Sequence, residues 1–279
     1  MIAHPNCKIN LGLRIVRRRP DGYHDLESVF LPVPLCDRLE IVPAAGGPVP
    51  VDFLQDGILV DCPPHDNICV KAYGLLKERF PQMPPVRMHL TKNIPFGAGL
   101  GGGSSDCAFV LRMLNRMFEL GLSAEDLRTL AARLGADCPF FIDNVPALVT
   151  GIGDRLAPLE FNPVAGFRML LAKPADTVGT GSAYAGLRLK ADAADLPSLE
   201  MLLRQPVERW KESVVNDFEQ SVFPQHPAVA RLKALFYGQG ALYASMSGSG
   251  AAVFALFDRQ KPLPQALFDA LGSQLLLDC

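Results

Sequence analysis

The 279-residue sequence predicts an α+β protein of two domains. Three observations predict this class: β-rich runs dominate the first 65 residues, amphipathic helical stripes follow them, and a new succession of strands and helices begins after residue 166. The stretch at 151–166 is rich in Gly, Pro and Asp, so we place a domain boundary there. The expected domains are 1–155 and 156–279, which suits a chain of this length.

In the first half, apolar or β-rich runs broken by Pro, Gly and Asp predict strands at 7–16, 26–33, 38–42 and 51–54. A helical stripe predicts a helix over 66–80, and strict alternation predicts a strand over 86–91. A glycine-rich loop at 95–105 then leads into an amphipathic helix that ends at Gly121. Ser123, followed three residues later by Asp126, predicts a capping box at the start of the next helix.

The second half begins with a strand predicted over 167–172. The segment 198–223 is helical in pieces interrupted at Pro206, and 227–237 predicts a further helix. Two strands at 241–246 and 252–257 flank a second glycine loop, and the apolar spacing of 263–277 predicts a closing helix.

Composition excludes several classes of function. Lys and Arg total 27 against 29 Asp and Glu, so no general attraction to nucleic acid or to an anionic membrane is expected. The longest uncharged apolar stretch, 241–257, is interrupted by Gly and Ser, and the first twelve residues do not resemble a secretory signal. Seven scattered cysteines are typical of reduced thiols, so we expect a cytoplasmic protein. The spacing of Cys62, His65 and Cys69 resembles a metal site but lacks a fourth ligand, so no metal is assigned to these residues.

The glycine-rich loop is the most informative motif. Five of the seven residues from Gly97 to Gly103 are glycine, and a helix follows at once. Backbone N–H groups of such a loop, together with the positive end of a helix, bind phosphate well, although a tightly packed turn is the alternative. The dinucleotide-binding pattern fits the spacing only, the Walker A pattern has Gly103 where its Lys should stand, and the signatures of protein kinases are absent from the sequence.

Three segments together resemble the motifs of the GHMP small-molecule kinases. They are CKINL at 7–11, PFGAGLGGGSSD at 95–106 and MSGSGA at 246–251. RPDGYH at 19–24 and LGADCPFF at 134–141 are similar to motifs of one branch of this family. Kinases of that branch phosphorylate the 2-hydroxyl of a cytidyl diphosphate substrate during isoprenoid precursor synthesis. The resemblance implies a two-domain α+β fold with the active site in the cleft between domains, and ATP with Mg²⁺. Cys7 and Asp106 depart from it, since the family usually has Ala and often Asn there.

The resemblance also implies roles for particular residues. Asp137 would accept the proton of the acceptor hydroxyl, and Lys8 would hold Asp137 ionised or stabilise the moving phosphoryl charge. The ATP-binding residues would be Pro95, Phe96, Gly97, Ala98, Gly99, Leu100, Gly101, Gly102, Gly103, Ser104 and Ser105, with Lys92. The substrate-binding residues would be Asn10, Tyr23, His24, Tyr184, Ser247 and Gly248, with Tyr23 and Tyr184 stacking on the cytosine. Ser104 or Ser105 would help to hold Mg²⁺.

Two other functions remain open from the sequence. One is a sister kinase for homoserine, mevalonate or a sugar, against which Tyr23, His24 and Tyr184 argue. The other is a catalytically silent nucleotide-binding relative, against which the presence of both Lys8 and Asp137 argues. We expect small-molecule partners only, in a monomer or a homodimer.

Overall fold

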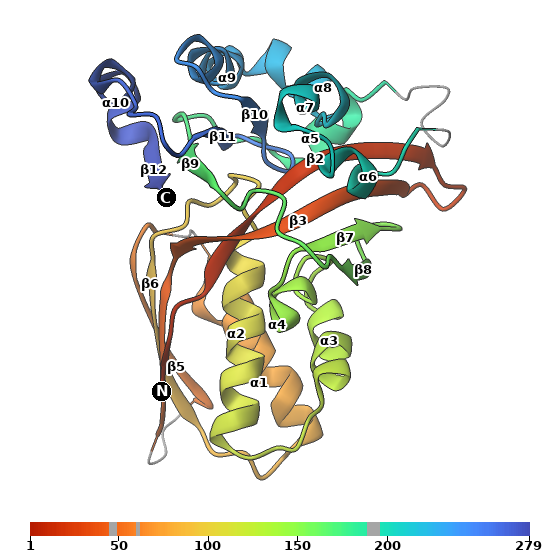
Figure 1. Ribbon diagram of the computed structural model, residues 1–279. Coiled ribbons are helices and arrows are strands. Elements are labelled where there is room, and N and C mark those ends of the chain that lie inside the picture. The colour runs from red at the N-terminus through yellow and green to blue at the C-terminus, as the bar shows by residue number, and fades with distance from the viewer. Residues whose placement is uncertain (45–48, 60–61, 189–195) are drawn as a thin grey trace. The chain divides into compact units, whose positions relative to one another are not determined.

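The computed structural model describes residues 1–44, 49–59, 62–188 and 196–279 (Figure 1). The chain divides into two compact units. Unit 1 comprises Met1–Cys7, Leu35–Phe96 and Gly101–Val145, and unit 2 comprises Lys8–Pro34, Gly97–Leu100 and Pro146–Cys279. These units interleave along the chain, so they do not follow the boundary expected at 155/156, and that boundary stays a prediction. Helices and sheets occur in both units, which confirms the α+β class.

Unit 1 contains a four-stranded sheet with two long helices beside it (Figure 1). The strand order is β1 (Ile2–Ala3), β4 (Arg38–Pro43), β6 (Val86–Lys92) and β5 (Val51–Gly57). The helical elements are η1 (Pro64–Asp66), α1 (Ile68–Arg79), α2 (Gly102–Met117), α3 (Ala124–Ala132) and α4 (Phe140–Asp143). Helix α1 packs against α2. The capping box predicted at the start of α3 is confirmed, because the side chains of Ser123 and Asp126 each accept the other's backbone N–H.

Unit 2 contains two further four-stranded sheets in the described chain. One has the order β2 (Asn6–Arg18), β3 (His24–Cys36), β7 (Ala147–Thr150) and β8 (Arg155–Pro158), and the other β10 (Tyr243–Met246), β11 (Val253–Asp258), β9 (Phe167–Ala172) and β12 (Leu275–Asp278). The first residues of β2 and the last of β3 extend into unit 1. The helical elements of unit 2 are α5 (Thr180–Ala185), α6 (Leu199–Leu203), η3 (Val207–Arg209), α7 (Trp210–Ser213), α8 (Glu219–Gln225), α9 (Pro227–Gly238), α10 (Gln265–Leu271) and η4 (Gly272–Gln274).

One predicted element is wrong. The closing helix expected over 263–277 ends at Leu271, because Gly272 adopts a φ of +48° that breaks the helical path. Residues Leu275–Asp278 form β12, which pairs antiparallel with β9. The last apolar residues of the predicted helical stripe therefore form an edge strand of this sheet.

The short strands β7 and β8 were not predicted, although β7 extends the first sheet of unit 2 by pairing with β3. None of the helices in the described parts of the chain is long and apolar enough to cross a membrane.

Candidate active site

Lys8 is a buried lysine near the start of β2, which is an outer strand of the first sheet of unit 2. Its side chain and that of Asn10 project from the same face of β2, because alternate residues of a strand share a face. The Lys8 ammonium donates to Asn10 Oδ1 at 2.5 Å and to the carbonyl of Gly99 at 3.3 Å, and lies 4.4 Å from the centre of the Phe30 ring. Lys8 is only 3% exposed, so its charge is held inside the protein.

The two glycine loops contact each other backbone to backbone within unit 2. Gly99 has a φ of +73°, and a Cβ there would stand 2.0 Å from the carbonyl oxygen of Ser247. The Ser247 hydroxyl donates to the Gly99 carbonyl at 2.9 Å and accepts the backbone N–H of Asn10. Part of the glycine content therefore serves close packing, because only glycine allows this approach.

Asn216 is a functional candidate that sequence reasoning missed. Its amide nitrogen donates to the carbonyls of Met246 and Gly248, both at 2.8 Å, and its Oδ1 accepts the backbone N–H of Phe218. This buried side chain thereby holds the second glycine loop at two points. The only signal in the sequence was a pair of polar residues, Asn216 and Asp217, between Val215 and Phe218.

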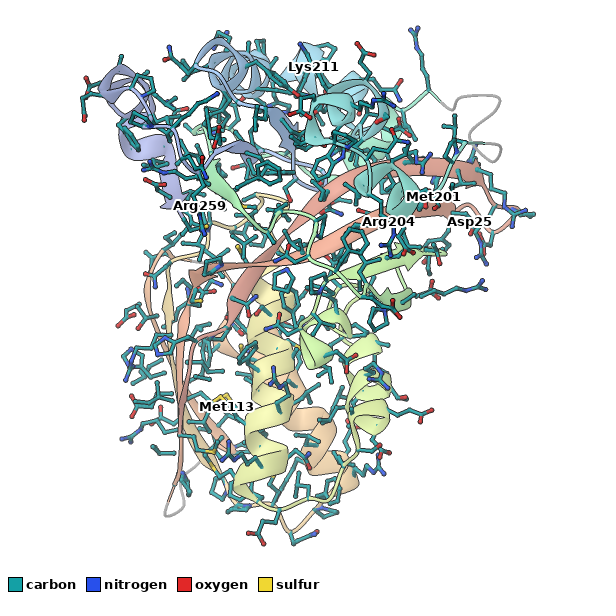
Figure 2. The ribbon with its side chains drawn as sticks, viewed as in Figure 1. Asp25, Met113, Met201, Arg204, Lys211 and Arg259 are labelled. Carbon is teal, nitrogen blue, oxygen red and sulfur yellow. The ribbon has the colours of Figure 1, made fainter. Side chains whose placement is uncertain are left out.

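The turn that presents Tyr23 and His24 is held by local hydrogen bonds and ion pairs. The backbone N–H of Arg19 donates to the Tyr23 carbonyl, and Asp21 accepts the backbone N–H of Tyr23. Asp25, near the end of the β2–β3 hairpin (Figure 2), pairs with Arg17 at 2.5 Å and with Arg19 at 3.3 Å. Hydrogen bonding, first with Arg17 and then with Arg19, lowers the pKa of Asp25 below its ordinary value.

The aromatic residues proposed for cytosine recognition differ in how much their rings already contact other side chains. Tyr184 stacks on His24, with ring centres 5.1 Å apart and planes at 28°, and meets Phe218 edge-on. Tyr23 is 62% exposed. Tyr184 therefore already has a ring on one face, and the expected pair of Tyr23 and Tyr184 around a cytosine stays a prediction.

In unit 1 the glycine loop runs directly into α2. Gly101 precedes the helix in the left-handed region, with a φ of +69°. Ser104 is half-buried in the first turn, whereas Ser105 is fully buried. Gly103 is exposed, and a Cβ placed on it would meet nothing within 4 Å. Packing therefore does not require glycine at position 103.

Lys92 has internal partners that the sequence did not reveal. Only 4% exposed, its ammonium donates to Asp37 and, at 2.7 Å, to Asp106 on α2. Asp37 also accepts the backbone N–H groups of Asn93 and Ile94. Burial lowers the pKa of Lys92, but the two carboxyl groups outweigh this effect, and its pKa is raised. Burial raises the pKa of Asp106 well above its ordinary range despite the nearby ammonium. Lys92 thus anchors the start of α2 in unit 1.

Asp137 is half-buried in the turn between α3 and α4 of unit 1. The next residue, Cys138, is hydrogen-bonded to Cys107 of α2 and to Ser104, and these bonds, the one with Cys107 first, lower the pKa of the Cys138 thiol. The turn that carries Asp137 is thereby tied to the first turn of α2. Asp137 and Lys8 belong to different units, and their pairing stays a prediction.

Comparison with known proteins identifies the family. The pattern described as GHMP kinases N terminal domain matches residues 67–151, and that described as GHMP kinases C terminal matches residues 198–273. The 4-diphosphocytidyl-2-C-methyl-D-erythritol kinase of Parabacteroides distasonis is 47% identical over 93% of this chain and 92% of its own length. The enzyme of the same name from Bacteroides thetaiotaomicron is 47% identical over 95% of both chains. The chain belongs to the GHMP kinases.

Solved structures agree with this assignment. A crystal structure of 4-(cytidine 5'-diphospho)-2C-methyl-D-erythritol kinase superposes on this GHMP kinase with a TM-score of 0.82, at 33% identity, over 99% of this chain and 96% of that one. A homoserine kinase from Cytophaga hutchinsonii, 18% identical with a TM-score of 0.67, shares the fold. The expected GHMP fold is confirmed, and membership makes the chain an ATP-dependent kinase.

Proposed function

We propose that this kinase transfers the γ-phosphoryl group of ATP to the 2-hydroxyl of 4-diphosphocytidyl-2-C-methyl-D-erythritol. The observation that carries the proposal is the buried Lys8 ammonium, held between Asn10 and the carbonyl of Gly99. It places a fixed positive charge against the first glycine loop, where phosphate would bind. The names of relatives that are 44–47% identical support the choice of substrate.

The phosphates of ATP would bind at the start of α2. The free backbone N–H groups of its first turn and the positive end of the helix attract anions. The space beside Gly103 supports this placement, because glycine in a helix costs stability that no packing contact there offsets. A ligand that approaches the backbone closely would use that space.

The residues present fit a Mg²⁺ ion that binds together with ATP. Among the described residues no group of three or more His, Cys, Asp or Glu side chains could hold a metal alone. Ser105 is fully buried and Asp106 is engaged by Lys92, so the half-buried hydroxyl of Ser104 is the better protein ligand. Mg²⁺ commonly binds in this way, through substrate phosphates, water and few protein groups, and it would neutralise phosphate charge.

Phosphoryl transfer requires positioning, charge neutralisation and a proton acceptor. The 2-hydroxyl oxygen forms a bond to the γ-phosphorus while the bond from that phosphorus to the β-phosphate oxygen breaks, and ADP leaves. Asp137 accepts the hydroxyl proton. Lys8 stabilises the negative charge of the transferred group. Tyr23, His24 and Tyr184 recognise the cytosine, since aromatic faces and a hydrogen-bonding edge suit a flat base.

A substrate panel tests the proposal. The purified protein is incubated with ATP, Mg²⁺ and one acceptor at a time: 4-diphosphocytidyl-2-C-methyl-D-erythritol, homoserine or mevalonate. We expect ADP release with the cytidyl substrate and a product phosphorylated at its 2-hydroxyl by NMR. Turnover with homoserine or mevalonate, and none with the cytidyl substrate, would refute the proposal.

A further inference from the structure

Ser28 lies on β3 in the middle of the first sheet of unit 2 and is fully buried. Its hydroxyl lies 2.6 Å from the carbonyl oxygen of Gly12 and 2.9 Å from the amide nitrogen of Asn10. A hydroxyl has one hydrogen to donate and two lone pairs to accept with. Because a carbonyl oxygen can only accept, the hydrogen of Ser28 goes to Gly12, and toward Asn10 the hydroxyl is an acceptor.

This arrangement decides the orientation of the Asn10 amide. The two ends of an amide have the same shape and differ only in hydrogen bonding. Since Ser28 accepts, the NH₂ end of Asn10 must face it, and Oδ1 must face the Lys8 ammonium. A flipped Asn10 would place two donors together at Lys8 and two acceptors together at Ser28. The chain of bonds from Gly12 to Lys8 therefore has one consistent direction.

The far end of this chain is fixed as well. Gly12 has a φ of +72°, and a Cβ there would come within 2.9 Å of Leu199 and 3.0 Å of Val214. The backbone of Gly12 is thus confined by packed side chains, which holds its carbonyl in place. Water has little access to this chain of hydrogen bonds, because Lys8, Asn10 and Ser28 are 3%, 2% and 0% exposed.

We propose that Ser28 is a positioning residue for phosphoryl transfer: it fixes the Asn10 amide, and through Asn10 it holds the Lys8 ammonium in place. The proposal rests on the role given to Lys8 in the proposed function. Ser28 itself touches neither substrate nor ATP in this scheme. Its removal would therefore lower kcat and leave KM for ATP unchanged.

Ser28→Ala is the direct test. We expect kcat to fall by about ten- to a hundredfold, with KM for ATP within about twofold of wild type. Ser28→Thr keeps the hydroxyl and should recover most of the lost kcat. Ser221→Ala is the matched control, because Ser221 is also a buried serine, and its hydroxyl lies within hydrogen-bond distance of two backbone carbonyls, that of Ala183 at 2.7 Å and that of Phe218 at 3.0 Å. Circular dichroism should show the same fold in all three variants.

A double-mutant cycle in kcat tests whether Ser28 acts through Asn10. In an Asn10→Ala background, Ser28→Ala should change kcat by less than about twofold, since the group it orients is gone. A wild-type kcat for Ser28→Ala, or fully additive losses in the cycle, would overturn the inference.

Lys8→Met separates this inference from the proposed function. If Lys8→Met is inactive and Ser28→Ala is normal, only the inference fails. If Lys8→Met keeps wild-type kcat, the role of Lys8 fails and the inference fails with it.

Discussion

The ammonium of Lys8 donates to the side-chain oxygen of Asn10, two residues along the same strand and 2.5 Å away. Their position on one face of β2 makes this contact a direct product of strand geometry. The carbonyl of Gly99 and the Phe30 ring also contact the ammonium and help to hold the charge in one place. A charge fixed before the reaction needs no reorganisation when negative charge develops, which is how buried cations contribute most to catalysis.

Replacing Lys8 by Met tests this role. The variant keeps the length of the side chain without the charge, so we expect kcat to fall by about 10² to 10³ while the fold is retained. ADP release in a coupled assay measures the effect. Arg18→Met is the control, because Arg18 is an exposed cation at the end of the same strand. Equal activity of the two variants would contradict a catalytic role for Lys8.

Replacing Asp137 by Asn removes the proposed proton acceptor with little change of shape. A general base typically contributes about 10² to 10⁴ in rate, so turnover should fall by that factor while ATP still binds. Turnover and nucleotide affinity, the latter by calorimetry, are measured on the same preparation. Asp143→Asn provides a carboxylate control in the nearby α4, where Asp143 pairs with Arg128 at the surface. A rate within a few-fold of wild type would exclude Asp137 as the base.

Gly103→Ala should change stability and ATP binding in opposite directions. Alanine in a helix is favoured over glycine by up to about 1 kcal/mol, and the space around residue 103 accepts a methyl group, so the free energy of unfolding should rise. The same methyl group would occupy space proposed for phosphate, and KM for ATP should increase by about tenfold or more. Gly238→Ala at the end of α9, where a Cβ also meets nothing, should leave KM unchanged. A Gly103→Ala enzyme with normal KM would place the phosphates elsewhere.

Asp106 makes stability depend on pH. Burial raises its pKa in the folded protein, so between about pH 4 and the raised value the folded state keeps a proton that the unfolded state has lost. Its contribution to stability therefore decreases as pH rises, by at most about 1.4 kcal/mol per pH unit. Asp106→Asn removes this group, and its free energy of unfolding, measured in urea at about pH 5, 6.5 and 8, should fall less steeply. Parallel curves for variant and wild type would contradict the raised pKa.

Local patterns were sufficient for most elements of the fold. The alternation of 86–91 and the side chains of Ser123 and Asp126 are signals that need no distant partner, and β6 and α3 formed as predicted. The end of the chain was different. Leu275–Leu277 carries no signal that separates helix from strand, and only the partner strand β9 decides the outcome.

Hydrogen bonds in unit 2 join four residues from three separate motifs, Lys8, Asn10, Gly99 and Ser247, while their roles in binding and catalysis stay predictions. The sequence could not reveal the residues whose role depends on partners far away along the chain. The partners of Lys92 are 55 and 14 residues away, so its burial could not be recognised from its position at a strand end. Ser28 and Asn216 lie outside every motif, and their importance comes only from what the fold places beside them.

Tyr23 supplies the last prediction, because it is a large aromatic side chain that lies exposed on a turn with several hydrogen bonds and ion pairs of its own. The Arg19, Asp21 and Asp25 interactions order the turn before substrate arrives, so binding a base to Tyr23 costs little further entropy. Stacking of a base on an aromatic ring contributes about 1–3 kcal/mol, so Tyr23→Ala should raise KM for the cytidyl substrate by roughly five- to a hundredfold. KM for ATP should not change, and Tyr23→Phe, which keeps the ring, should behave as wild type. If Tyr23→Ala leaves KM for the cytidyl substrate unchanged, the ring of Tyr23 does not contact the cytosine.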